Sequence, residues 1–205
     1  MTRKYTYLFY VDFSITVYER NSLIVNSNSP IIHYFTSMPL LATITDADFG
    51  SQPVDSSNFR RRQAVRAVLF DENGEIAVLY VAKEMYHKLP GGGVEAGESL
   101  TSALTRECLE EAGSRPEIES EIGSVIEIRG QEKLVQESVC YLARVKGERR
   151  APKFTEDEKA NQFSLRFMSI DDALEKLKSD KPQSYNGRFI QKRDSAFLAA
   201  VAAML

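Results

Sequence analysis

The feature of this sequence that most constrains its fold is a run of three glycines followed directly by a helix pattern. Gly91, Gly92 and Gly93 allow the backbone to approach a ligand at a point where any Cβ would obstruct it. Residues 99–112 then repeat apolar side chains with the i, i+3, i+4 spacing of an amphipathic helix packed on a sheet. Gly113 follows, at the position where a left-handed residue commonly ends a helix. Loop and helix are therefore predicted to form one unit.

Glutamates stand in this helix where apolar core residues are expected. At about 100° per residue, Glu107 and Glu111 point within about 20° of Leu100, into the buried sector, and Glu110 lies on its flank. Like charges at this spacing repel each other, and burial increases the cost. Carboxylates at a polar edge of the core suit Mg²⁺ or Mn²⁺, and the glycine loop could donate backbone N–H groups to a bound phosphate. For an arbitrary helical charge cluster we would favour a solvated charged face, and the helix phase weakens that alternative here.

These loop and helix residues resemble the Nudix box, written G-x5-E-x7-R-E-U-x-E-E-x-G-U, where U is a bulky aliphatic residue. In two aliphatic positions of the pattern, Cys108 is a small hydrophobe and Ser114 is polar, and neither change removes a ligand. With so many fixed positions, a chance match in one short chain is very improbable. The match runs over residues 92–114, and its charged and glycine positions are Gly92, Glu98, Arg106, Glu107, Glu110, Glu111 and Gly113.

The resemblance implies a fold and a reaction. The fold is α/β, a Nudix-type α/β/α sandwich with a mixed β-sheet over about residues 60–205. The reaction is hydrolysis of the diphosphate linkage of a nucleoside diphosphate joined to another moiety. The chain would then be a nucleotide pyrophosphohydrolase, an enzyme acting on phosphorus-containing acid anhydrides. Nucleoside triphosphates, ADP-ribose and nucleotide sugars all stay open as substrates, because loops outside the box determine that choice.

The resemblance also implies roles for the box residues. Glu107, Glu110 and Glu111 would bind Mg²⁺ or Mn²⁺, and Arg106 would orient the glutamates by ion pairing, chiefly with Glu98. A bound divalent metal lowers the pKa of the attacking water and neutralises the charge that develops on the leaving group. Within the box, Glu110 is our first candidate for the general base.

Two acidic sites outside the box are further candidates. Glu137 lies in a predicted strand on the same alternating face as Val139 and Tyr141, which is an unusual place for a free carboxylate. It is either a further ligand or base, or an edge-strand glutamate turned to water, and we weigh the two equally. Residues 155–158 could form a catalytic loop, but we favour a simple acidic turn.

Isolated basic and histidine residues carry weaker signals. Arg188, Lys192 and Arg193 could contact phosphate, although a basic helix face is more often solvated. His33 and His87 stand alone in the sequence, and we expect each to be structural or exposed rather than catalytic.

Strand patterns alternate with helix patterns along the chain, which indicates a mixed α/β fold. Residues 71–74, Asp-Glu-Asn-Gly, have hairpin turn chemistry because Asn-Gly accepts the positive φ angles that such turns need. The predicted strands or extended segments are residues 5–17, 22–35, 64–70, 75–82, 122–129 and 134–145, and the later predicted helices are residues 170–178 and 188–204.

The composition of the chain changes before the catalytic region. Residues 50–58 are polar, with Pro53 and several serines, and are typical of a linker. We therefore divide the chain into an N-terminal extension and linker, residues 1–58, and a Nudix hydrolase domain, residues 59–205. Met38 could itself begin a protein, so the first 37 residues are either an accessory segment or an over-extended gene start.

Charge and cysteine usage exclude several classes of function. With 26 Lys and Arg against 29 Asp and Glu, the net charge of −3 provides no general field for binding DNA. Cys108 and Cys140 lack the spacing of a zinc site or disulfide framework, which fits a reducing cytoplasm. No stretch approaches the roughly 20 apolar residues of a membrane helix. We expect a soluble cytoplasmic protein with a small nucleotide substrate and no DNA or membrane partner.

Three alternatives stay open at this point. A homodimer could form if the aromatic N-terminal segment paired with the sheet of another subunit. A non-hydrolytic module that binds nucleotide as a regulatory ligand is the rival function, but it would be expected to have lost box glutamates or the arginine. An RNA-end hydrolase would need a basic channel that the net charge does not indicate.

Overall fold

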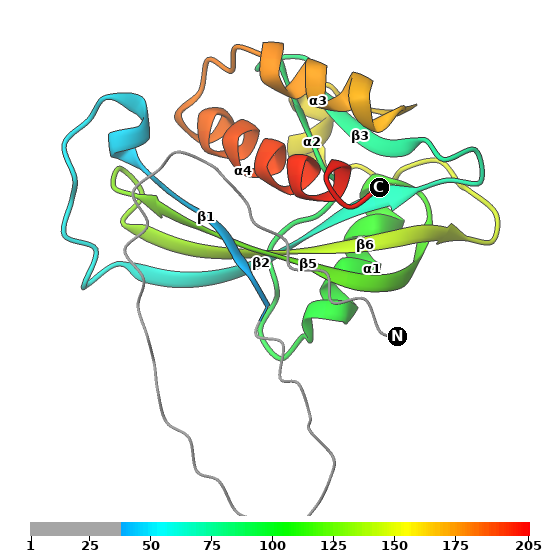
Figure 1. Cartoon of the computed structure of the whole chain (residues 1–205), viewed down its shortest axis with the longest axis horizontal. Helices are drawn as coiled ribbons and strands as arrows, with labels where there is room; N and C mark the ends of the chain where they lie inside the picture. Colours follow the sequence, from blue (N-terminus) through cyan, green and yellow to red (C-terminus); the bar gives the residue numbers. More distant parts are fainter. Residues whose placement is uncertain (1–37) are drawn as a thin grey trace, which may run out of the picture. The chain divides into compact units, whose positions relative to one another are not determined.

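The structure, a computed structural model, describes residues 38–205, and a seven-stranded β-sheet runs through them (Figure 1). Its strands are β1 (Leu40–Thr45), β2 (Arg60–Phe70), β3 (Ile76–Val81), β4 (Tyr86–Lys88), β5 (Arg115–Arg129), β6 (Leu134–Lys146) and β7 (Phe163–Met168). The helices are η1 (Asp46–Phe49), α1 (Leu100–Glu111), α2 (Glu156–Ala160), α3 (Ile170–Ser179) and α4 (Tyr185–Ala202). The strands are arranged in the order β1-β5-β6-β2-β3-β4, and β7 pairs with β3.

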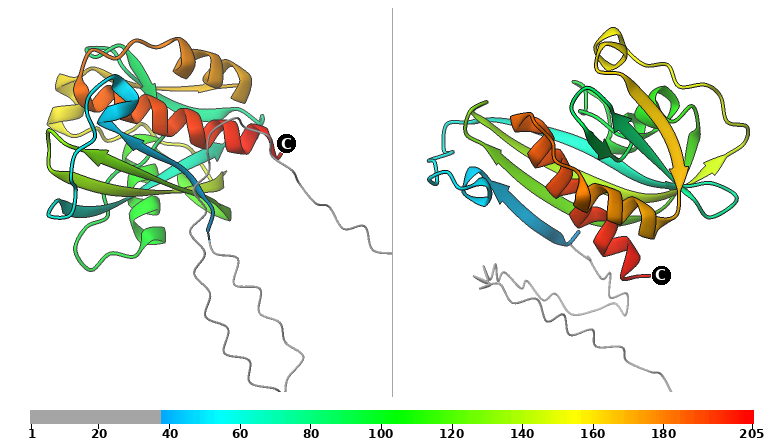
Figure 2. Two further views of the ribbon diagram at one scale, coloured as in Figure 1. Left: turned by 60° about the vertical axis from the view of Figure 1, so that its left-hand side comes forward. Right: turned by 90° about the horizontal axis from the view of Figure 1, so that it is seen from above.

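The sheet is mixed, as predicted. β1 runs parallel to β5 and β2 runs parallel to β6, whereas the pairs β5 and β6, β3 and β4, and β3 and β7 are antiparallel. Residues of α1 pack on one face of the sheet, and residues of α3 and α4 pack on the other (Figures 1 and 2). The expected α/β/α sandwich is therefore confirmed.

Strand β2 shows how the sequence produces these layers. Its odd-numbered Val65 and Leu69 lie in the apolar cluster with α1, and its even-numbered Val68 and Phe70 lie in the cluster with α3 and α4. Because successive side chains of a strand point to opposite faces, a strand between two helical layers must be apolar on both. The apolar residues 67–70 meet that requirement, and Arg66 is a buried charged residue earlier in the strand.

The turn after β2 differs in part from the predicted hairpin. Gly74 has a positive φ of 79°, but Asn73 does not belong to the residues with positive φ. Asp71 organises the turn instead, because its carboxylate accepts hydrogen bonds from the backbone N–H groups of Asn73 (2.9 Å) and Glu75 (3.0 Å). β2 and β3 then pair at a single position, Phe70 with Ile76, because β3 leaves β2 to pair with β4 and β7.

The described chain begins close to β1. Strand β1 pairs with β5, and its Ile44 is buried in the core with residues of α4. Residues that precede the expected domain boundary at residue 59 therefore contribute to the sheet. The division at residues 58 and 59 stays a prediction. The strands predicted at residues 5–17 and 22–35 lie outside the described residues.

Within residues 38–205, no helix is both long and apolar enough to span a membrane.

Candidate active site

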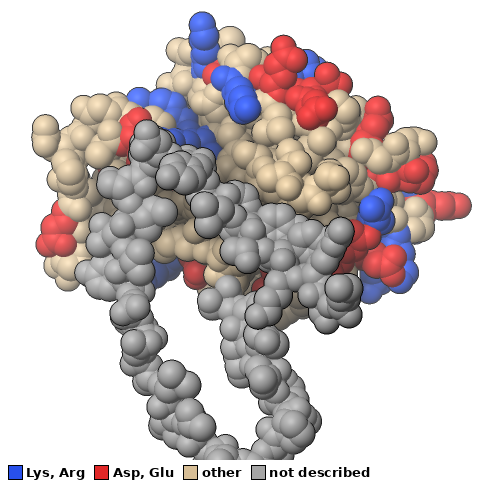
Figure 3. Space-filling model, viewed as in Figure 1, with Lys and Arg blue, Asp and Glu red and all other residues tan. Residues whose placement is uncertain are grey.

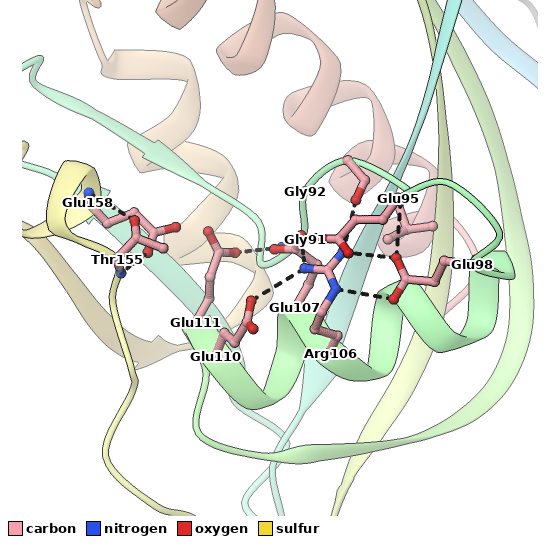
Figure 4. A network of polar contacts seen from close by, with 12 residues as sticks. Gly91, Gly92, Glu95, Glu98, Arg106, Glu107, Glu110, Glu111, Thr155 and Glu158 are labelled. Atoms are coloured by element: carbon pink, nitrogen blue, oxygen red, sulfur yellow. Dashed lines mark hydrogen bonds and ion pairs between the residues drawn. The ribbon is translucent and has the colours of Figure 1, made fainter.

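The glycine loop and α1 pack against each other as one unit (Figure 4). The Gly91 N–H donates to Oε2 of Glu111 at 2.7 Å, and the φ of Gly91 is 136°. A Cβ at Gly91 would overlap the carbonyl of Val65, and a Cβ at Gly92 would overlap the carboxylate of Glu107. The loop therefore needs glycine for close contact with the protein's own strand and helix.

Helix α1 has the ends and the buried face that the sequence predicts. The Ser99 hydroxyl accepts the Ser102 N–H at 3.1 Å at the start, and Gly113 follows the helix with a left-handed φ of 61°. Cys108 is fully buried in the core, and Ser114 is buried with its hydroxyl donating to the Ala112 carbonyl at 3.0 Å. Both departures from the box pattern are thus accommodated.

The helix phase places two of the three box glutamates in the interior. Glu107 and Glu111 are 9% and 2% exposed, and they line a cavity of about 290 Å³. Glu110 lies on the flank of the helix, with its side chain 44% exposed. Figure 4 shows the three carboxylates along the C-terminal half of α1. The predicted orientation of each glutamate is confirmed.

Arg106 connects the glycine loop to α1 because its guanidinium group contacts four other residues. Its Nε and Nη2 donate to the two carboxylate oxygens of Glu98, each at 3.1 Å, and Nη2 also donates to the Gly93 carbonyl at 3.0 Å. Its Nη1 lies 2.7 Å from Glu107 and 3.3 Å from Glu110. The hydrogen bonds to Glu98 above all, and then those to Glu107, raise the pKa of Arg106. The ion pair expected between Arg106 and Glu98 is present.

Lys88 is a site residue that sequence reasoning missed. It lies in the short strand β4, and its Nζ is 2.6 Å from Oε1 of Glu111. Burial raises the pKa of Glu111, while Lys88 and the N–H of Gly91 act against that shift. Lys88 thus supplies positive charge beside a buried carboxylate. Its position three residues before the glycine run was the available signal.

The donor set suits a hard divalent cation in chemical type, because all three candidate ligands are carboxylate oxygens. Within residues 38–205, no three acidic, histidine or cysteine side chains gather as a metal-binding group. Lys88 and Arg106 bind the glutamates instead, and so supply the countercharge that two buried carboxylates require. The three carboxylates therefore fit a divalent metal by donor type, while Lys88 and Arg106 are their partners in the arrangement that the structure describes.

Glu137 does not line the cavity of Glu107 and Glu111, but it lines a groove beside it that shares Arg62 with that cavity. Its Oε2 accepts from Nε2 of Gln63 at 3.3 Å, and it lines this groove with Glu98 and residues 94–97. Strand β6, which carries Glu137, lies between β5 and β2 in the sheet. The alternative that Glu137 belongs to an edge strand is therefore wrong. The role of Glu137 as ligand or base stays a prediction.

The acidic turn at residues 155–158 begins α2, as we favoured, but it also reaches the cavity. The Thr155 hydroxyl accepts the Glu158 N–H at 3.3 Å, and the Glu158 carboxylate accepts the Thr155 N–H at 2.7 Å. Glu158 also lines the cavity with Glu107 and Glu111 (Figure 4). A backbone hydrogen bond of 2.7 Å from Lys153 to the Glu110 carbonyl brings this segment to α1, and nothing in the local sequence reveals that contact.

The basic residues near the C-terminus separate into different environments. Arg193 is fully buried and lines the cavity, so a solvated helix face is the wrong description for it. Lys192 is exposed and pairs with Asp48 at 2.5 Å, while Arg188 stacks over Phe49 at 5.4 Å from the ring centroid. Of these three residues, Arg193 is the one that lines the cavity with Glu107 and Glu111, and a phosphate contact from the group stays a prediction.

The histidine that the structure describes is structural. His87 is 6% exposed, and its Nδ1 lies 3.0 Å from Oδ2 of Asp180, a contact that ties β4 to the end of α3. His33 lies outside the described residues.

The fold and the box together define the class of protein: a hydrolase acting on phosphorus-containing anhydrides. The NUDIX domain family model matches residues 60–187, and the chain belongs to the Nudix family. A search of curated protein sequences found no match.

Two solved structures illustrate the shared fold. The chain is similar to the solution structure of the E. coli ORF135 protein, with 20% identity and a TM-score of 0.51, over 75% of this chain and 95% of that chain. It is also similar to a NUDIX hydrolase from Nitrosomonas europaea, with 17% identity and a TM-score of 0.51, over 71% of this chain and 90% of that chain. These likenesses support the fold alone.

Proposed function

We propose that this chain is a metal-dependent hydrolase that cleaves the diphosphate linkage of a nucleoside diphosphate joined to another moiety. One observation carries the proposal: Glu107 and Glu111 are buried against a glycine loop at the wall of a cavity. Buried acidic side chains on a helix are unfavourable unless positive charge compensates them. Lys88 and Arg106 compensate the two carboxylates in this structure, and a divalent metal would add positive charge at the point where it can hold a substrate diphosphate.

Glu107, Glu110 and Glu111 would hold the metal, which we propose to be Mg²⁺, with Mn²⁺ as the alternative. When bound, such an ion lowers the pKa of a coordinated water and neutralises charge on the leaving group. Arg106 holds Glu107 and Glu110 in place from the side of Glu98. It acts as a positioning residue for the carboxylates.

Glu110 is our first candidate for the general base. Its side chain is 44% exposed, and Arg106 contacts its Oε2, which leaves Oε1 free to accept a proton from water. Glu137, in the neighbouring groove, remains the candidate that the sequence indicated. Glu158 becomes a third, because it lines the same cavity as Glu107 and Glu111.

We also propose a small nucleotide substrate, no DNA partner and a cytoplasmic location. The face of the molecule in Figure 3 carries both acidic and basic side chains, which does not resemble a surface for a polyanion. Cys108 and Cys140 are free and buried, as suits a reducing compartment. A homodimer stays a proposal that analytical ultracentrifugation would test.

The experiment that tests the proposed function compares hydrolysis with and without divalent metal. Purified full-length protein is incubated with a nucleoside triphosphate, ADP-ribose and a nucleotide sugar, in Mg²⁺ or in excess EDTA, and phosphate is measured after coupled phosphatase treatment. We expect hydrolysis of at least one substrate in Mg²⁺, loss of it in EDTA, and recovery when Mg²⁺ is restored. Full activity in EDTA would contradict the metal assignment, and nucleotide binding without hydrolysis would favour the regulatory module.

A further inference from the structure

Three buried arginines form one wall of the cavity that Glu107 and Glu111 line. Arg66 comes from β2, Arg129 from the end of β5 and Arg193 from α4, and they are 5%, 6% and 0% exposed. Figures 1 and 2 show α4 lying across the sheet, which brings these distant segments together. We call Arg66, Arg129 and Arg193 the arginine wall.

Each member of the arginine wall keeps a buried nitrogen without a hydrogen-bond partner among the described residues. The nitrogens are Nε of Arg66, Nε of Arg129 and Nη2 of Arg193. Buried donors in native proteins are almost always paired, because an unpaired donor has lost its hydrogen bonds to water. The three residues line one cavity, and each keeps part of its hydrogen-bonding capacity unused among the described residues.

Carboxylates pair with two members of the arginine wall, Arg129 and Arg193. Glu127 accepts from Arg129 at 2.7 Å and Arg193 at 3.3 Å, and Asp194 accepts from Arg193 at 2.7 Å. Glu132 also lies 3.5 Å from Arg129, so the carboxylates gather on Arg129 and Arg193.

Arg66 is the member without a carboxylate partner. Within residues 38–205, its hydrogen bonds go to the backbone carbonyls of Val65 and Gly92. Burial above all, and then the positive charge of Arg193, lower its pKa to about 10. Among the described residues, Arg66 thus brings a buried guanidinium with no carboxylate hydrogen bond to the wall of the cavity.

We propose that the arginine wall binds a terminal phosphoryl group of the substrate, and that the enzyme therefore prefers substrates ending in an unesterified phosphate. A nucleoside triphosphate has such a group, whereas both phosphates of ADP-ribose and of nucleotide sugars are esterified. A terminal phosphate carries nearly two negative charges at neutral pH, and planar guanidinium groups match its geometry. This inference rests on the proposed function.

The shape and chemistry of the cavity favour a phosphate over a nucleobase at this wall. The acceptors there, Glu127 and Asp194, are already bound by Arg129, Arg193 and the backbone N–H of Leu89. These two carboxylates are therefore already occupied by donors of the protein. A volume of about 290 Å³ lies at the small end for ligand sites and suits a phosphate chain better than a second nucleoside.

The first test measures binding of pyrophosphate to full-length protein that a chelating resin has stripped of metal. Without metal, the box glutamates repel the anion, so binding reports on the arginines. We expect pyrophosphate to bind the wild-type protein by calorimetry and to raise its melting temperature. Arg66→Met should weaken binding about 10-fold or more, as expected for loss of a charged hydrogen bond. Arg144→Met, which removes an exposed arginine of β6, should bind like the wild type.

Arg66→Lys keeps the test decisive if Arg66→Met does not fold. Lysine retains the charge but not the fork of donors, so we expect an affinity between those of the wild type and Arg66→Met. Circular dichroism in the near ultraviolet shows whether each variant is folded. Wild-type affinity in a folded Arg66→Met or Arg66→Lys protein, or no binding of pyrophosphate to the wild type, would overturn the proposal.

The second test measures substrate preference in Mg²⁺. We expect the ratio of kcat/KM for a nucleoside triphosphate to kcat/KM for ADP-ribose to fall about 10- to 100-fold in the folded Arg66 variant. An unchanged ratio in an active enzyme would overturn the terminal phosphate subsite and leave the proposed function intact. If the wild type hydrolyses nothing, the proposed function fails, and the pyrophosphate measurement still decides whether the arginine wall binds phosphate.

Discussion

Glu127 holds the arginine wall together, and replacing it should change how the protein responds to acid. It is fully buried in β5 and accepts hydrogen bonds from Arg129 (2.7 Å), Gln136 (2.7 Å), Ser138 (3.2 Å) and Arg193 (3.3 Å). Burial opposes its ionisation, but the guanidinium groups of Arg193 and Arg129 outweigh burial and hold its pKa at about 2. The ordinary value is 4.5.

The free energy of unfolding follows from this difference in pKa. Because the pKa of Glu127 is lower in the folded state, its ionisation stabilises the fold above pH 4.5, and that contribution is lost as the pH falls from 4.5 towards 2. Each pH unit is worth about 1.4 kcal/mol, so the whole contribution is about 3 kcal/mol, of which about 2 kcal/mol is lost by pH 3.

The assay is urea unfolding of the wild type and of Glu127→Gln at pH 7 and at steps between pH 5 and pH 3. The variant should be about 3 to 5 kcal/mol less stable at pH 7, because it leaves buried arginine charge uncompensated. Its stability should then fall about 2 kcal/mol less than that of the wild type by pH 3. Glu119→Gln, at an exposed ion pair with Arg144, is the control and should follow the wild type. Parallel curves for the wild type and Glu127→Gln would refute this account of Glu127.

Two further predictions concern the loop and the N-terminal segment. Gly92→Ala should lower kcat/KM at least about 10-fold, because its Cβ would displace the Glu107 carboxylate, whereas Gly74→Ala, in an open turn, should affect stability alone. Equal kinetics of the two alanine variants would show that the close contact at Gly92 is unimportant. Deleting residues 1–37 should preserve metal binding and hydrolysis, since the described sheet begins at Leu40. Loss of metal binding by a folded truncation, measured by calorimetry, would show that the segment completes the site.

The local part of the site could be predicted because it depends on helix geometry. The rotation of 100° per residue places Glu107 and Glu111 inside and Glu110 on the flank, as observed. Gly113 ends the helix for a reason visible in the sequence, its freedom to adopt a positive φ. The fold itself followed from the resemblance of the box and from the alternation of strands and helices.

The opposite side of the cavity could not be predicted, because topology assembles it. Arg66 and Arg193 are far apart in sequence, and they meet because α4 crosses the face of the sheet to which the even-numbered residues of β2 point. A pattern analysis regards Arg193 as a surface residue, since its partner Glu127 lies on a strand 66 positions away. Lys88 and Glu158 reach the cavity for the same reason, from β4 and α2.

The most direct test of the catalytic account compares kcat and melting temperature for Glu110→Gln and Glu156→Gln. The amide at position 110 keeps the volume of the side chain but removes the charge that binds metal or accepts a proton from water. Glu156 is the matched control, because it is an exposed acid of α2 paired only with Lys159. We predict that Glu110→Gln lowers kcat about 100-fold or more in Mg²⁺ at an unchanged or slightly higher melting temperature, while Glu156→Gln keeps wild-type kcat. Near wild-type kcat in both variants would contradict the account and show that the glutamates of α1 are a charged helix face.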